Sequence, residues 1–369
     1  MKILMAIKRL EDMAGGAERV FLQVAEGLQT QYGHELVLVT FDRKKAESFY
    51  TVPEGITWIR LGIGDSSKRA GYLETLKRLF LLRGVVKKIS PDLLIPFQHS
   101  MFVPMVLAMT GIKIPVIASE HIVPDHYKSR PLEFALLILT GLRCQKITVL
   151  SDAIIKMYPK ILWSRMVAIS NPVVISNQVA DVVGVLEKRK TLLSVGRLDP
   201  QKDQKTLIDA FALIADKFPD WDLKIIGEGT LRSTLSRQVE DLGLSERILL
   251  SGLTKNIMHD YQSSQAFVLA STYESFGLAT AEAMSVGLPV IGFADCPGTN
   301  EIIKDQKNGL LVSVGRKDGR AKSLARAMTS IMSNADLRQS LGKQGRKDML
   351  VFSPSTIVSQ WQDLIKSVI

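Results

Sequence analysis

The sequence contains little that would support a disulfide framework, a metal site or a membrane-spanning segment. Cys144 and Cys296 are its only cysteines and form no Cys-x-x-Cys pair, and its five histidines show no metal-ligand spacing. No apolar run reaches the roughly 18 residues of a spanning helix, and the apolar stretch 3–7 is too short for a signal-peptide core. These absences favour a reducing, cytoplasmic setting and a chain that binds no metal.

The composition does not favour intrinsic disorder. Hydrophobic residues make up 46% and charged residues 23% of the 369 positions, which is typical of globular proteins. A chain of this length exceeds one compact core, so two domains are expected. An unpatterned stretch at 178–190 follows a strand-breaking Asn171-Pro172. The sequence therefore predicts one domain over 1–174 and a second that begins at 175.

The positive charge is concentrated in the first half of the chain. The net charge is +10; residues 1–170 hold 23 Lys and Arg against 15 Asp and Glu, whereas residues 171–369 hold 24 against 22. This asymmetry indicates an anionic partner for the first half. A membrane surface, a phosphorylated acceptor and nucleic acid are the candidates.

Short β-rich runs alternate with helical patterns along both halves. Strands are expected at 2–7, 35–41, 57–61, 92–96, 115–119 and 146–150, and then at 191–195, 223–226, 247–251 and 267–270. Such alternation is typical of an α/β fold with parallel, doubly wound sheets. Ligands of these sheets bind at the loops that follow the carboxyl ends of the strands.

The stretch 268–292 is the central segment of the second half, and its pattern predicts a strand, a loop, a helix and a second strand. Glu274 lies in the loop before the helix, and Glu282 lies in the second helical turn. Free backbone amides near Gly277, between the two carboxylates, attract a phosphate, which carboxylates repel. Hydroxyl-rich groups on either side of a phosphate are the layout of a nucleotide sugar.

The frame S-T-Y-E-S-F-G-L-A-T-A-E-A-M around these glutamates resembles the Glu-x7-Glu signature of retaining glycosyltransferases of family 4. The resemblance implies the GT-B fold, with two Rossmann-like domains facing across a cleft. It implies that Glu274 holds sugar hydroxyls and Glu282 the ribose, with Phe276, Gly277 and Leu278 also binding substrate.

Other motifs of the second half strengthen the resemblance. In G-R-L-D-P-Q-K-D, Arg197 and Lys202 occupy a strand-to-helix loop, where Arg offers a two-pronged contact and Lys a mobile charge. The resemblance makes them the partners of the donor diphosphate, in place of a metal. Leu253 and Thr254 occupy the loop where the family holds its base.

The first half resembles the family in shorter motifs. Gly15 and Gly16 in G-G-A-E-R permit positive φ and close approach of an acceptor or phosphate to the main chain. His121, at a strand end, is where the family places a histidine against the transferred sugar. The resemblance also implies that a final helix, 353–369, crosses back onto the first domain.

The segment 67–90 combines leucines and aromatics at helical spacing with seven Lys and Arg. Such a basic amphipathic helix is typical of a segment that lies on an anionic membrane. A helix packed on the core with a solvated basic face is an equally good interpretation.

The sequence thus predicts a retaining glycosyltransferase without a cofactor, located at the cytoplasmic membrane face. It would transfer a hexose or N-acetylhexosamine from a UDP-sugar to a lipid-linked or polysaccharide acceptor. A GT-B sugar-nucleotide epimerase and a phosphorylase share the architecture, although a phosphorylase needs a lysine-bound pyridoxal phosphate. A nucleic-acid-binding protein would explain the charge, but the basic cluster is interleaved with leucines instead of the aromatics that stack on bases.

Overall fold

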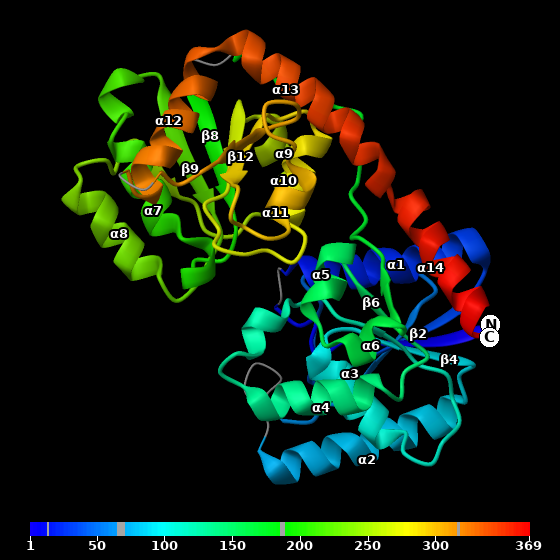
Figure 1. Cartoon of the computed structure of the whole chain (residues 1–369). Helices are drawn as coiled ribbons and strands as arrows, with labels where there is room; N and C mark the ends of the chain where they lie inside the picture. The colour runs from blue at the N-terminus through cyan, green and yellow to red at the C-terminus, as the bar shows by residue number, and fades with distance from the viewer. Residues whose placement is uncertain (13–14, 65–70, 185–188, 316–317) are drawn as a thin grey trace. The chain divides into compact units, whose positions relative to one another are not determined.

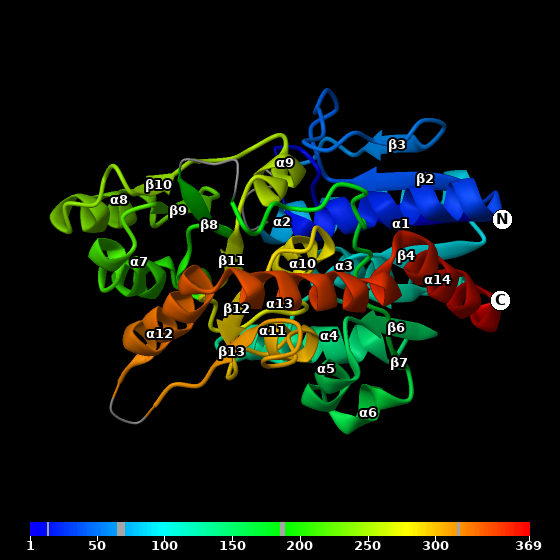
Figure 2. The same ribbon diagram turned by 90° about the horizontal axis from the view of Figure 1, so that it is seen from above.

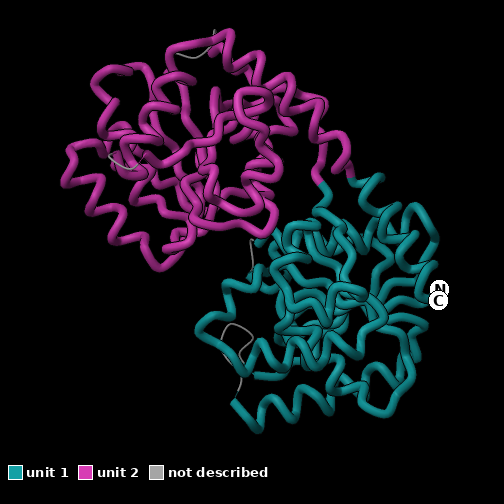
Figure 3. Tube along the Cα trace, in the orientation of Figure 1, with its two compact units in different colours: residues 1–172, 354–369 teal, residues 173–353 magenta. Residues whose placement is uncertain are grey.

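The computed structural model describes residues 1–12, 15–64, 71–184, 189–315 and 318–369. The chain folds into two compact units, drawn in different colours in Figure 3. Unit 1 comprises Met1–Pro172 and Pro354–Ile369, and unit 2 comprises Val173–Ser353. Each unit is a complete α/β assembly with its own sheet and core.

Unit 1 is built on two short parallel sheets that meet at one edge. The first has the order β3-β2-β1-β4 and the second β5-β6-β7. Isolated parallel bridges, Leu94 with Val116 and Phe97 with Ser119, join β4 to β5. The strands are β1 (Lys2–Ala6), β2 (Glu35–Thr40), β3 (Thr57–Arg60), β4 (Leu93–Pro96), β5 (Ile117–Ser119), β6 (Lys146–Val149) and β7 (Met166–Ala168).

Helices that are far apart in sequence pack together in unit 1. The last helix, α14 (Pro354–Val368), lies along α1 (Gly16–Tyr32), with His34 Nε2 2.7 Å from Gln362 Oε1 (Figure 1). Trp361 of α14 stacks on Phe97 with ring centroids 5.8 Å apart. The remaining helices are α2 (Tyr72–Ile89), α3 (His99–Ala108), η1 (Pro124–Tyr127), α4 (Pro131–Gly141), α5 (Asp152–Met157) and α6 (Lys160–Trp163).

Unit 2 contains one parallel sheet of order β10-β9-β8-β11-β12-β13. Helices α7, α8 and α12 cover one face, and α9, α10 and α13 cover the other (Figures 1 and 2). The strands are β8 (Lys190–Val195), β9 (Trp221–Ile226), β10 (Ile248–Leu250), β11 (Ala266–Val268), β12 (Val290–Phe293) and β13 (Leu310–Val312). The helices are η2 (Pro200–Lys202), α7 (Gln204–Ala212), η3 (Ala215–Lys217), α8 (Arg232–Asp241), α9 (Ile257–Gln262), α10 (Leu278–Ser285), α11 (Thr299–Ile302), α12 (Arg320–Ser333), α13 (Ala335–Asp348) and η4 (Met349–Phe352).

The sheets are covered on both faces because their strands are apolar on both faces. All four residues of β4 and all four of β12 are buried, as expected for strands between two helical layers. Every pairing between the named strands is parallel in the part of the chain that the structure describes. The predicted doubly wound α/β architecture is confirmed.

No described helix has the length and apolar content that would let it cross a bilayer. The longest, α2, has exposed apolar residues on one face and packs another face on the core. Its buried residues are Arg78, Leu82 and Val86.

Candidate functional site

The loop between β8 and α7 is shaped by two aspartates that cap consecutive helices. The Asp199 carboxylate accepts a hydrogen bond from the Lys202 backbone N–H (3.3 Å) at the start of η2. Asp203 adopts φ 47° and accepts from Thr206 N (3.4 Å) at the start of α7. Lys202 is therefore fixed between two caps at the carboxyl end of β8.

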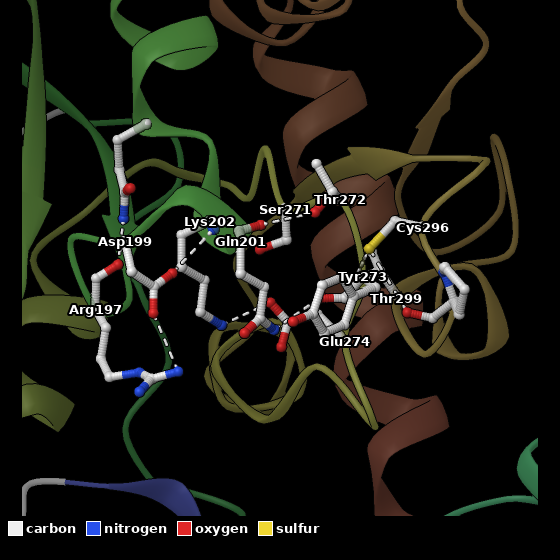
Figure 4. A network of polar contacts seen from close by, with 12 residues as sticks. Arg197, Asp199, Gln201, Lys202, Ser271, Thr272, Tyr273, Glu274, Cys296 and Thr299 are labelled. Carbon is white, nitrogen blue, oxygen red and sulfur yellow. Dashed lines mark hydrogen bonds and ion pairs between the residues drawn. The ribbon is translucent and has the colours of Figure 1, made fainter. Parts of the chain in front are cut away.

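Lys202 and Glu274, predicted to bind different parts of a donor, are paired with each other. The Lys202 Nζ donates to Glu274 Oε1 at 2.6 Å (Figure 4). Only 15% of the lysine side chain and 10% of the glutamate side chain are exposed. Arg197 pairs with Asp199 at 3.0 Å, and 71% of its side chain is exposed. The structure thus brings Lys202 and Glu274 together and leaves Arg197 at the rim.

The loop that carries Glu274 is held by hydrogen bonds to two other strand-end loops. Thr272 N donates to Gln201 O (2.9 Å), and Gln201 Nε2 donates to Tyr273 O (2.8 Å). On its other side, Glu274 N donates to Pro297 O (2.9 Å). Loops following β8, β11 and β12 therefore position the carboxylate jointly, at the sheet edge where the sequence placed the site.

Helix α10 begins directly after this loop. Its N-cap, Gly277, has φ 82°, a left-handed conformation that favours glycine, and no side chain caps the first amides. The side chain of Phe276 is buried and packs edge-on against Phe352, with centroids 5.3 Å apart. The predicted substrate contact of Phe276 is thereby restricted to its backbone.

Glu282 is a buried carboxylate on α10. It accepts a hydrogen bond from the hydroxyl of Tyr261, at 3.1 Å between the oxygen atoms. The predicted base loop follows β10 at the edge of the sheet, where 55% of Leu253 is exposed and the Thr254 hydroxyl accepts from Asn256 N (3.1 Å).

The Gly-Glu-Gly turn after β9 serves the protein's own backbone. A Cβ at Gly227 would overlap the carbonyl of Gly196, so the glycine permits the loops after β8 and β9 to touch. This close packing accounts for a glycine at position 227, so a contact with a nucleotide is not needed to explain it.

Arg320, at the start of α12, is a residue of this site that the sequence motifs did not single out. Its Nη1 pairs with Asp295 at 2.9 Å, and its Nε lies 3.5 Å from Asp203. Its Nη2 donates to the carbonyls of Ala270 (3.3 Å) and Ser271 (3.4 Å). One guanidinium thus ties together the loops that follow β8, β11 and β12. No local sequence motif marks it, because its partners come from three distant segments.

In unit 1, His121 follows β5 and is buried. Its Nε2 lies 3.0 Å from the Ser119 hydroxyl, and its ring stacks on Phe97 with centroids 5.2 Å apart. Desolvation lowers the pKa of His121 to about 4, against a weaker opposing effect of Glu120, so the imidazole is neutral at pH 7. Its Nδ1 has no hydrogen-bond partner among the described residues.

The two adjacent glycines of the first half do not adopt the expected positive φ. Gly15 is the N-cap of α1 with φ −89°, and Gly16 is absent from the residues with positive φ. A Cβ at Gly15 would collide with the carboxylate of Glu18 in the first turn of the helix. The glycine therefore accommodates this buried glutamate, a local reason that the sequence motif did not reveal; Met13 and Ala14 lie outside the described residues.

The Asp220-Trp221-Asp222 string lies at the amino end of β9, opposite the loops of the site. Asp220 pairs with Lys190 (2.6 Å), and Asp222 pairs with Arg189 (2.5 Å). The described residues contain no cluster of metal-ligating side chains.

The basic helix of unit 1 differs from its expected arrangement. Residues 67–70 of the predicted 67–90 segment lie outside the described residues. Arg78 is buried, pairs with Glu74 at 2.5 Å and stacks over Phe41 at 4.5 Å, so this cation faces the core. Arg83 donates to the carbonyls of Ala108 (2.7 Å) and Thr110 (2.8 Å).

Five apolar side chains of α2 are exposed, whereas Leu82 and Val86 are buried. Helix α4 has a second exposed apolar face, and both helices pack against α3. The exposed apolar residues are Tyr72, Leu73, Leu76, Phe80 and Leu81 on α2 and Leu132, Leu136 and Leu139 on α4.

Two family models match the chain, one in each half. The model described as Glycosyl transferases group 1 matches residues 177–348, and the one described as Glycosyltransferase Family 4 matches residues 14–177.

Two bacterial relatives named as glycosyltransferases match nearly the full length of the chain. An uncharacterized glycosyltransferase of Haemophilus influenzae is 26% identical over 360 residues, covering 95% of this chain and 96% of the relative. A Campylobacter jejuni alpha-1,4-N-acetyl-D-galactosaminyltransferase, named for an acceptor glycan on PP-undecaprenol, is 26% identical over 370 residues, covering 100% and 99%. The structure of Anabaena HepE with UDP and glucose has a TM-score of 0.82 at 20% identity, and the match covers 100% of both chains.

Proposed function

The chain is a glycosyltransferase with the GT-B fold, and from that premise we propose that it transfers a hexose or N-acetylhexosamine from a UDP-sugar with retention of configuration. The proposed acceptor is a lipid-linked or polysaccharide glycan. The names of the Campylobacter relative and of the UDP-bound Anabaena structure support the acceptor and donor classes.

The observation that carries this proposal is the Lys202–Glu274 pair in front of α10. A donor diphosphate would replace Glu274 as the main anionic partner of Lys202, and Glu274 would then accept bonds from sugar hydroxyls. Lys202, Arg197 and the free amides after Gly277 would stabilise the charge that grows on the departing diphosphate. The ion pair thus holds the two side chains together in front of α10.

The proposed retention of configuration at the sugar C1 rests on the carboxylates available around Lys202. Among the described residues, Glu274 is the one carboxylate paired with the Lys202 ammonium, and it is occupied by hydroxyls in this scheme. We therefore assign attack to the same face of the sugar, with the leaving phosphate accepting the proton of the acceptor hydroxyl. The C1–O bond to UDP breaks as the C1–O bond to the acceptor forms, and UDP leaves with the proton.

Glu282 would bind the ribose hydroxyls, and Leu253 and Thr254 would border the base. His121 is neutral at pH 7, so it suits a hydrogen bond to a sugar hydroxyl rather than donation of a proton.

The outward faces of α2 and α4 support a peripheral membrane location at the cytoplasmic face. Exposed leucines and aromatics on α2 and α4, which both pack against α3, would enter the lipid interface together with the exposed cations Lys77, Lys87 and Lys88. A membrane contact would bring the chain to a lipid-linked acceptor.

A panel of radiolabelled UDP-sugars tests the function directly, because many transferases slowly hydrolyse their donor without an acceptor. We expect release of free sugar and UDP from one donor, and loss of this release in Glu274→Gln. The matched control is Glu301→Gln, which removes the same charge from an exposed position on α11. Turnover of no UDP-sugar in the panel, with or without added glycan acceptors, would refute the proposal.

A further inference from the structure

Glu282 is the carboxylate to which the ribose is assigned, and its position is set by a second buried residue. Tyr261 is fully buried, and its ring packs 6.0 Å from that of Phe267 in β11. Its hydroxyl donates to Glu282 Oε2 at 3.1 Å. A phenol without exposure to water must find its partner in the protein, and here that partner is an anion.

The helix that carries Tyr261 is capped at its start and paired with the sheet near its end. Asn256 caps α9 by accepting from His259 N at 3.4 Å, and it belongs to the same loop as Leu253 and Thr254. Asp260, next to Tyr261, pairs with Lys224 of β9 at 2.6 Å. The pairing of Asp260 with β9 fixes the position of α9 against the sheet, and the Tyr261 hydroxyl on α9 contacts Glu282 from that position.

We propose that Tyr261 is a positioning residue for ribose recognition: its hydroxyl fixes the rotamer of Glu282 and thereby sets the preference for ribonucleotide over deoxyribonucleotide donors. This inference rests on the proposed binding of UDP by unit 2. A carboxylate has several acceptor positions, so the tyrosine bond and bonds from ribose hydroxyls coexist. Because Tyr261 and the base loop lie on one short segment, 253–261, that segment links recognition of the base with recognition of the ribose.

The test compares the affinities of UDP and 2′-deoxy-UDP, measured by calorimetry on the full chain. A hydrogen bond to a charged group contributes about 1.5–3 kcal/mol, so the wild type should prefer UDP by roughly 10- to 100-fold. In Tyr261→Phe this preference should shrink to a few-fold, because UDP binds less tightly while 2′-deoxy-UDP is little affected. Phe267→Leu is the packing control: it loosens the ring contact, keeps the hydroxyl and should keep the preference.

Glu282→Gln and the double variant separate the two levels of the inference. If Glu282→Gln removes the preference for UDP, and the double variant behaves like Glu282→Gln alone, the two residues act as one unit. If Glu282→Gln removes the preference while Tyr261→Phe retains it, the positioning role is wrong and the ribose assignment stands. If Glu282→Gln retains the preference, the ribose assignment itself is wrong. Should Tyr261→Phe not fold, 4-fluorophenylalanine at 261 keeps the shape of the ring and replaces the hydroxyl by a group that donates no hydrogen bond; an unchanged preference would then contradict the proposal.

Discussion

Replacing Glu274 by Gln should separate the structural and the catalytic parts of the Lys202–Glu274 pair. The change leaves a mostly buried ammonium opposite a neutral amide, which still accepts its hydrogen bond. Complete removal of one partner of a buried ion pair costs about 3–5 kcal/mol, but loss of the charge alone should cost about 1–3 kcal/mol. For a unit of this size, 1 kcal/mol lowers Tm by roughly 2–4 °C, so a loss of about 2 kcal/mol lowers it by about 4–8 °C.

The same variant should still bind UDP as well as the wild type does, or more tightly, because Lys202 no longer has an internal anion to exchange for the diphosphate. Turnover should nevertheless fall at least about 100-fold, which is about 2.7 kcal/mol of lost transition-state stabilisation. Thermal unfolding with and without UDP, calorimetric titration with UDP and donor hydrolysis measure these three effects, with Glu301→Gln as the charge-matched control. Near-normal turnover, or UDP binding weakened tenfold in a folded variant, would refute the reasoning.

Three further predictions follow from the two units. Activity should persist in excess EDTA, and Lys202→Ala should weaken UDP binding more than Arg197→Ala does, because Arg197 is largely solvated. Inhibition by EDTA that Mg²⁺ or Mn²⁺ reverses would show that the Lys202 and Arg197 side chains do not replace a metal. Burial lowers the pKa of His121 from 6.5 to about 4, so between these pH values the unfolded chain binds a proton that the folded chain does not, and the free energy of unfolding should fall as the pH drops from 6.5 to 4. The variant His121→Gln should remove up to about 3 kcal/mol of this pH-dependent loss, measured by denaturation at several pH values. Identical pH profiles for the wild type and the variant would refute the lowered pKa of His121. Changing Lys77, Lys87 and Lys88 to Ser should weaken binding to anionic vesicles on the order of 100-fold at low salt. Changing Leu73, Phe80 and Leu132 to Ser should weaken this binding too, whereas the same change at the exposed Leu213 and Leu249 of unit 2 serves as the control. Co-sedimentation with vesicles that neither set of changes affects would exclude this surface as the membrane contact.

Much of the fold could be predicted from the sequence because its signals are local. Alternating apolar runs and helical patterns identify strands such as β1 and β8, and parallel sheets place ligand loops at the carboxyl ends of strands. The aspartate before Lys202 and the glycine before α10 are likewise local cap signals, so the short elements around the site were predictable.

The contacts within the site could not be predicted in the same way. Lys202 and Glu274 are 72 residues apart, and nothing in either motif indicates that they pair with each other. The partners of Arg320 lie in three loops and the partner of Tyr261 lies on helix α10, and neither residue lies in a recognisable motif. Helical periodicity also left open which residues of α2 pack on the core, because a buried Arg78 satisfied by Glu74 and Phe41 looks in sequence like a solvated cation.

The central claim is that this chain cleaves a UDP-sugar with retention, using Glu274 at the sugar. Time-resolved proton NMR of donor hydrolysis reads the configuration of the first sugar released, before mutarotation scrambles it. With an α-linked UDP-sugar, the wild type should release the α-anomer first, in the presence of EDTA, and Glu274→Gln should release almost none. Initial release of the β-anomer, or equal release by the Glu274→Gln variant, would contradict the account.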